Sequence, residues 1–127
     1  MQFKNIEEFN NELDKLPGEE NVILEDGILW LKQDYAINRM NEIFGEGNWS
    51  IEKIRKNELI NETGISFGYS CILTVSCKNP INGNLRIMDG ISGTSGTLDN
   101  NIIGRAFLNA ISHFGNTFGG NLSYQFE

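Results

Sequence analysis

The residues of this chain best suited to a specific chemistry are basic side chains that can neutralise phosphate groups. Lys53, Arg55 and Lys56 form the only cluster of them, in a stretch whose weak alternation predicts an outer strand over residues 49–60. Lysine and arginine supply the sequence-independent part of nucleic-acid affinity. The three bases fall on both parities of the strand, however, and that pattern is more typical of an exposed, solvated face.

A second candidate is the glycine-rich stretch GISGTSGT at residues 90–97, just ahead of a predicted helix. Backbone N–H groups of such a loop can hold a phosphate, helped by the helix dipole. The stretch lacks the lysine and the spacing of a P-loop, and Asp99 at the expected helix cap would oppose an anion. We therefore expect a flexible turn here, with a nucleotide phosphate site as the alternative.

The residue types of the chain give little support for a metal site or for catalysis. Cys71 and Cys77 are six positions apart in one predicted strand, about 20 Å, which is too far for a disulfide between them. Two thiols and a lone histidine, His113, make a poor ligand set, so we expect no metal and no cofactor. No nucleophile motif or placed pair of carboxylates accompanies His113, and we expect the protein not to be an enzyme.

The net charge of −7 is unevenly distributed along the 127 residues. Residues 1–26 carry −6 and residues 27–127 only −1, so the acidity belongs to the N-terminal segment. This segment is either a solvated helix or an acidic arm that mimics nucleic acid or binds a basic partner. The sequence has no apolar run of membrane-spanning length and no signal-peptide core, so we expect a cytoplasmic protein without membrane contact.

The elements that must position these residues follow from hydrophobic periodicity. Apolar spacing predicts a short helix from Asn5 that ends at Pro17-Gly18, and a helix from Gln33 or Asp34 to Gly45. Between them, a two-stranded ribbon is expected around the turn at Asp26-Gly27.

The C-terminal half predicts three strands and a long helix. Strict alternation over residues 65–77 marks the clearest strand, and turn residues at 80–84 lead into a strand over residues 85–91. An apolar stripe then predicts a helix from Asn100 to Phe114, capped by Asp99 or Asn100. The expected fold class is α+β: an antiparallel three-stranded meander packed on the long C-terminal helix, a β-β-β-α core with N-terminal helices. We divide the chain into an acidic helical segment, 1–26, and a single α+β domain, 27–127.

Three stretches resemble the Rad fifty-two single-strand annealing family, including its bacteriophage members. They are the helix and its exit at Ala36–Gly45 with Trp49, the strand opening at Phe67–Tyr69, and the helix end at Ala110–Gly119. Their order and spacing carry the resemblance, which covers roughly residues 28–122. It implies a core that assembles into rings or filaments and holds single-stranded DNA by its phosphates, leaving the bases able to pair.

The chain departs from that family at the positions expected to hold phosphates. Alignment on the shared Phe-Gly-Asn motif places Leu108, Asn109 and Ser112 where the family has lysine or arginine. The family's basic residue near the start of the earlier helix is replaced by Tyr35. Arg105, one turn before Leu108, is the residue that can stand in.

Two hypotheses follow. In the first, the chain is a phage-borne protein of DNA recombination and repair that forms a ring or filament and binds and anneals single-stranded DNA. Multivalency would then add up weak contacts in each subunit. The DNA-binding residues in this hypothesis are Lys53, Arg55, Lys56, Arg86 and Arg105.

In the second, the same fold has lost its DNA groove and serves as a protein-binding inhibitor or regulator, such as a phage counter-defence protein. Its acidic N-terminal segment would then bind a host protein. The charge of residues 1–26 and the missing bases of the last helix favour this alternative.

Overall fold

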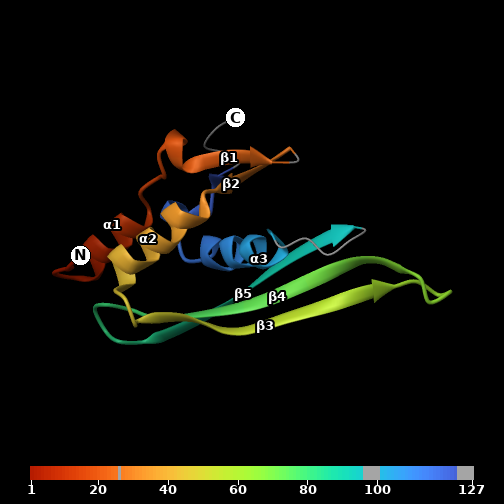
Figure 1. Ribbon diagram of the computed structural model, residues 1–127. Coiled ribbons are helices and arrows are strands. Elements are labelled where there is room, and N and C mark those ends of the chain that lie inside the picture. Colours follow the sequence, from red (N-terminus) through yellow and green to blue (C-terminus); the bar gives the residue numbers. More distant parts are fainter. Residues whose placement is uncertain (26, 96–100, 123–127) are drawn as a thin grey trace.

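The computed structural model describes residues 1–25, 27–95 and 101–122. A three-stranded antiparallel sheet carries helices and a two-stranded ribbon on one of its faces (Figure 1). This α+β architecture confirms the predicted β-β-β-α core. In chain order the elements are α1 (Ile6–Leu13), η1 (Glu19–Asn21), β1 (Val22–Glu25), β2 (Ile28–Leu31), α2 (Gln33–Phe44), β3 (Trp49–Ile60), β4 (Ser66–Lys78), β5 (Leu85–Ser95), α3 (Asn101–Ser112) and η2 (Asn116–Phe118).

The central strand of the sheet is β4, with β3 and β5 antiparallel on either side of it. Alternate residues from Cys71 to Cys77 are buried toward α3, as the strict alternation predicts. Opposite them, Ser92 of β5 donates a hydrogen bond to the carbonyl oxygen of Ile102, which ties the start of α3 to the sheet. We call the sheet face toward α3 the inner face and the opposite one the outer face.

A β-bulge interrupts β3 between Ile51 and Lys53. Before the bulge, Trp49 and Ile51 pair with buried residues of β4 and face α3. After it, Lys53 and Arg55 pair with residues of β4 that face away from α3. Unbroken alternation over residues 49–60 would place these four residues on one face of the strand, but the additional residue of the bulge reverses the alternation and separates them.

Aromatic side chains join α1, α2 and the end of α3 into one core. The Phe44 ring lies 6.0 Å from Phe9, 6.0 Å from Phe114 and 6.1 Å from Phe118, measured between centroids. The first two pairs are edge-to-face and the third is stacked, and both arrangements add to the free energy of simple burial. Phe9 brings the N-terminal segment into this core, and the ribbon of β1 and β2 spans the expected boundary at residue 26.

A buried arginine ties the same elements together by polar contacts. Arg39 on α2 donates to Glu12 of α1 at 2.6 Å and to the Thr117 hydroxyl at 2.9 Å. The arginine side chain is only 10% exposed and Glu12 only 12%, so the charges compensate each other away from most of the solvent. Tyr35, which stands where the related family has a base, donates a long hydrogen bond to the Thr117 carbonyl.

Two element boundaries differ from the expectations. The first helix ends at Leu13, four residues before Pro17. The backbone N–H of its capping residue Asp14 donates a hydrogen bond to the carbonyl oxygen of Asn10. The glycine-rich stretch from residue 90 to 95 is strand rather than a turn, because each of its residues pairs with β4, up to Ser95 opposite Gly68. The remainder of that stretch and the predicted caps, Asp99 and Asn100, lie outside the described residues. In the part of the chain that is described, no helix is long and apolar enough to cross a bilayer.

Candidate nucleic-acid interface

The five cations predicted to bind DNA lie in separate regions of the structure. Lys53 and Arg55 are exposed together on the outer face of the sheet. Lys56 pairs with Cys71 and therefore projects on the inner face, beside α3. The structure thus brings together two of the five, and these two face away from the helix that was expected to line the groove.

Arg86 closes the C-terminal end of α3 onto the sheet. Its guanidinium donates to the carbonyl oxygen of His113 at 2.9 Å and lies 5.2 Å from the centre of the Phe114 ring. Both contacts belong to the packing of the helix end, and the cation–π contact adds to the hydrogen bond. Arg86 is therefore a structural residue at this position, and His113 takes part through its backbone.

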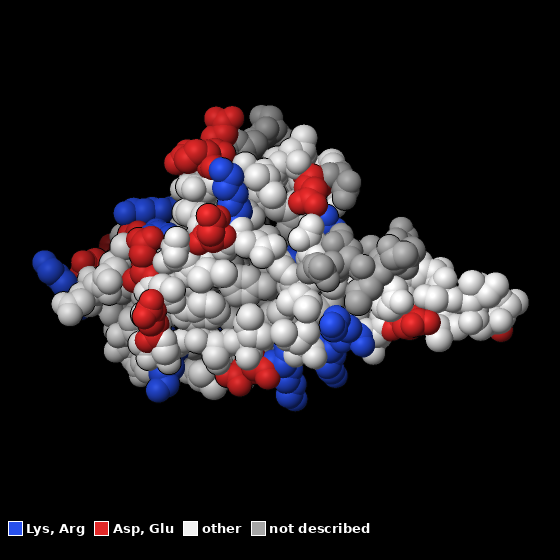
Figure 2. All heavy atoms as spheres, in the orientation of Figure 1, with Lys and Arg blue, Asp and Glu red and all other residues white. Residues whose placement is uncertain are grey.

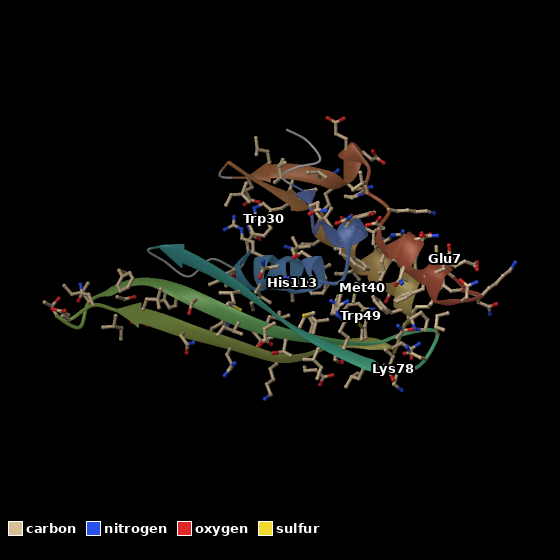
Figure 3. The ribbon with its side chains drawn as sticks, turned by 180° about the vertical axis from the view of Figure 1, so that it is seen from behind. Glu7, Trp30, Met40, Trp49, Lys78 and His113 are labelled. Atoms are coloured by element: carbon tan, nitrogen blue, oxygen red, sulfur yellow. The ribbon has the colours of Figure 1, made fainter. Side chains whose placement is uncertain are left out.

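Arg105 on α3 faces the ribbon of β1 and β2. Its guanidinium forms an ion pair with Glu25 at 2.7 Å and lies 5.8 Å from the centre of the Trp30 ring. Figure 3 shows Trp30 on the side of the ribbon that faces α3. The contact joins residues 80 positions apart in the sequence and fixes the ribbon over the helix.

A groove runs between the ribbon, α3 and the free edge of β5. One cavity of about 240 Å³ lies between Ile28–Leu31 of β2, one side of α3 and residues 118–122. A neighbouring cavity of about 220 Å³ lies between the ribbon, Arg105 and β5 at Ser92 and Gly93. The two cavities share Ile28 and Trp30, and we call them together the edge groove.

The three positions that the sequence resemblance aligns with basic residues line this edge groove. Leu108, Asn109 and Ser112 form one of its walls. Asn109 accepts a hydrogen bond from the Ile91 N–H of β5, and Ser112 donates to the Asn109 carbonyl. The wall is therefore polar but uncharged.

The charge of the edge groove comes from a single ion pair. Among its described lining residues, Glu25 and Arg105 are the only charged ones. Figure 2 shows basic and acidic side chains interspersed over one side of the molecule, without a broad basic patch. All other described residues that line the groove are uncharged.

The outer face of the sheet is the second notable surface. Beside Lys53 and Arg55 it carries Leu85, Ile87 and Ile91, which are 61%, 57% and 63% exposed. No element covers this face in Figure 1. Asp89 lies between Ile87 and Ile91 on the same face, so the surface is mixed apolar and charged. Exposed apolar side chains on an uncovered sheet face indicate a candidate surface of association.

A polar cluster lies on the same outer face, near the start of β3. Glu52 accepts hydrogen bonds from the hydroxyls of Ser50 and Ser76, each at 2.6 Å, and these bonds lower the pKa of its carboxyl group. Glu52 therefore stays ionised on the face that carries Lys53 and Arg55.

Sequence reasoning missed Trp30 and Glu25 as components of a site. The ribbon itself was predicted, but nothing in its short strands distinguishes a packing tryptophan from one that lines a groove. The feature of the sequence that could have pointed to Trp30 is its position in a four-residue strand beside a turn. Neither any protein-family model nor any curated protein matches the chain, so the family resemblance rests on the three motifs.

Proposed function

We propose that the chain is a single-stranded DNA-binding and annealing protein of homologous recombination that acts as a homo-oligomer. One observation supports this proposal: Leu108, Asn109 and Ser112 line the edge groove. The sequence resemblance places these residues at the positions where the annealing family has lysine or arginine. The strand would lie along this groove, above the β5 edge.

The lining of the groove supports a weak and sequence-independent mode of binding. Arg105 is the cation among the described residues that line the groove, and Trp30 offers an aromatic ring on which a base can stack. Asn109 and Ser112 add polar side chains along the wall. Weak binding suits annealing, because the strand must remain able to pair with its complement and then leave.

Association between copies would compensate for the weakness of each groove. Contacts of low affinity become strong together when neighbouring subunits hold one strand. The exposed apolar side chains Leu85, Ile87 and Ile91 on the outer face provide a surface for such association. On this proposal Lys53 and Arg55 belong to the association surface, Arg86 to the fold and Arg105 to the DNA contact. Lys56, on the inner face, is not among the residues that line the edge groove.

A second candidate function is a protein-binding inhibitor or regulator, such as a phage counter-defence protein. The observation that favours it is the pairing of the groove's cation, Arg105, with Glu25. The charge of −6 on residues 1–26 would then attract a basic surface of a host protein. The two functions differ in the partner they require.

Anisotropy of a labelled single-stranded oligonucleotide tests the proposal, together with light scattering on a size-exclusion column. The proposal predicts binding that weakens steeply as salt rises, faster pairing of complementary strands, and an assembly larger than one chain. Absence of binding at about 20 mM salt, where phosphate contacts are strongest, would contradict it. Specific capture of one host protein by the same preparation would then support the second function.

A further inference from the structure

We infer that Trp30, Arg105 and Glu25 form a subsite for one nucleotide of the strand, in which a phosphate takes the place of the Glu25 carboxylate on Arg105. This inference rests on the proposed function and names the residues that would deliver it. It also assigns roles to Trp30 and Glu25.

The geometry of the three residues is that of a cation held between an aromatic ring and an exchangeable anion. Arg105 lies 5.8 Å from the centre of the Trp30 ring and 2.7 Å from a carboxylate oxygen of Glu25. Arginine binds carboxylate and phosphate through the same planar array of N–H donors. A phosphate can therefore replace Glu25 without a change in the orientation of the guanidinium.

Burial indicates which partner of the ion pair moves. The Arg105 side chain is 16% exposed, whereas that of Glu25 is 40% exposed and stands at the end of β1. Packing against Trp30 already orders the Arg105 side chain. Glu25, the more exposed partner, is therefore the one that can turn into solvent.

Two cavities beside Trp30 offer space for a base. The cavity of about 220 Å³ lies toward β5, and another of about 140 Å³ lies toward Gln33 and α3. Trp30, Glu25 and Arg105 line both. The arrangement thus offers an aromatic surface beside a cation, the combination that holds an unpaired base and its phosphate.

The subsite predicts an unusual effect of removing one acidic residue. Glu25→Gln leaves Arg105 packed on Trp30 and removes the competing anion, so the affinity for oligothymidine should rise about three- to fivefold at about 50 mM salt. Glu46→Gln is the matched control. It makes the same change in net charge at an exposed position in the turn between α2 and β3.

The test measures oligothymidine binding by anisotropy for the wild-type protein, both glutamine variants, Arg105→Gln and the Glu25→Gln/Arg105→Gln double variant. Circular dichroism melting checks that each is folded. The gain from Glu25→Gln should exceed that from Glu46→Gln and vanish in the Arg105→Gln background. Oligothymidine should also quench tryptophan emission, whereas an abasic strand of equal length should not, and Trp30→Phe should remove that quenching.

The possible failures are distinguishable. If the wild-type protein binds and Glu25→Gln gains no more than Glu46→Gln, or loses affinity, the subsite is wrong and the proposed function stands. Equal quenching by the abasic strand would likewise remove the base from the subsite. If no variant binds at about 20 mM salt, the proposed function is wrong and the subsite falls with it.

Discussion

Gly90 of β5 and Ala106 of α3 meet backbone to backbone. A Cβ atom on Gly90 would lie 1.9 Å from the Ala106 carbonyl oxygen and 2.4 Å from the amide nitrogen of Ala110. Only a residue without a side chain lets the helix come this close to the strand. The position of α3, and with it one wall of the edge groove, depends on this contact.

Gly90→Ala should therefore destabilise the protein strongly. The methyl group would meet backbone atoms that cannot rotate away, which costs about 2–3 kcal/mol of unfolding free energy. Chemical denaturation followed by circular dichroism measures the change. Gly93→Ala on the same strand is the control, because its Cβ atom would lie 3.5 Å from the Tyr69 carbonyl oxygen, an ordinary van der Waals contact, and it should change stability little. Equal losses in the two variants would contradict the close packing at Gly90.

The main helices and strands were predictable because each has its own local pattern of apolar residues. The alternation that ends at Cys77 has the period of a half-buried strand, and the apolar stripe from Ile102 to Ile111 has that of a helix. The strand character of residues 90–95 was not predictable. Glycine and serine favour a turn there, and pairing with β4 overrides that preference.

The candidate site was much less accessible to sequence reasoning. A bulge of one residue turns Lys53 and Arg55 to the outer face, and no pattern in β3 reveals where it occurs. The ion pair of Arg105 with Glu25 joins positions 80 residues apart, so it exists only once the ribbon has folded over α3.

The ion pair between Arg39 and Glu12 predicts how stability depends on pH. Hydrogen bonds from Lys15 and Arg39 lower the pKa of Glu12 below its usual value of 4.5. A lowered pKa in the folded state means that the stabilisation is complete above pH 4.5 and is lost as pH falls through the folded-state value. Glu12→Gln should therefore flatten the acid limb of the stability curve, measured by urea denaturation at several pH values. An unchanged acid limb would contradict this role.

The two buried thiols should be protected in the native protein. Burial raises the pKa of Cys77 to about 11 and also raises that of Cys71. Since the thiolate is the reactive form, both should label slowly with iodoacetamide at about pH 8 and rapidly in denaturant. Mass spectrometry of the labelled protein over time reads out both rates. Rapid labelling without denaturant would contradict the burial of this strand.

The outer face of the sheet should mediate association. Ile91→Asp places a charge among the exposed apolar side chains of that face and should shift the assembly toward single chains. Ile65→Asp is a matched control, because Ile65 is equally exposed, at 63%, beside the turn between β3 and β4. Light scattering on a size-exclusion column compares the two. An assembly that survives Ile91→Asp as well as it survives Ile65→Asp would remove the outer face from the interface.

A single strand in the edge groove should depend on Arg105 and not on Arg55, which lies on the outer face of the sheet. Anisotropy with labelled oligothymidine at about 50 mM salt compares Arg105→Gln with Arg55→Gln, two identical changes of charge. Arg105→Gln should weaken binding about fivefold or more and Arg55→Gln by less than about twofold. Equal losses, or a larger loss from Arg55→Gln, would contradict the groove as the binding site.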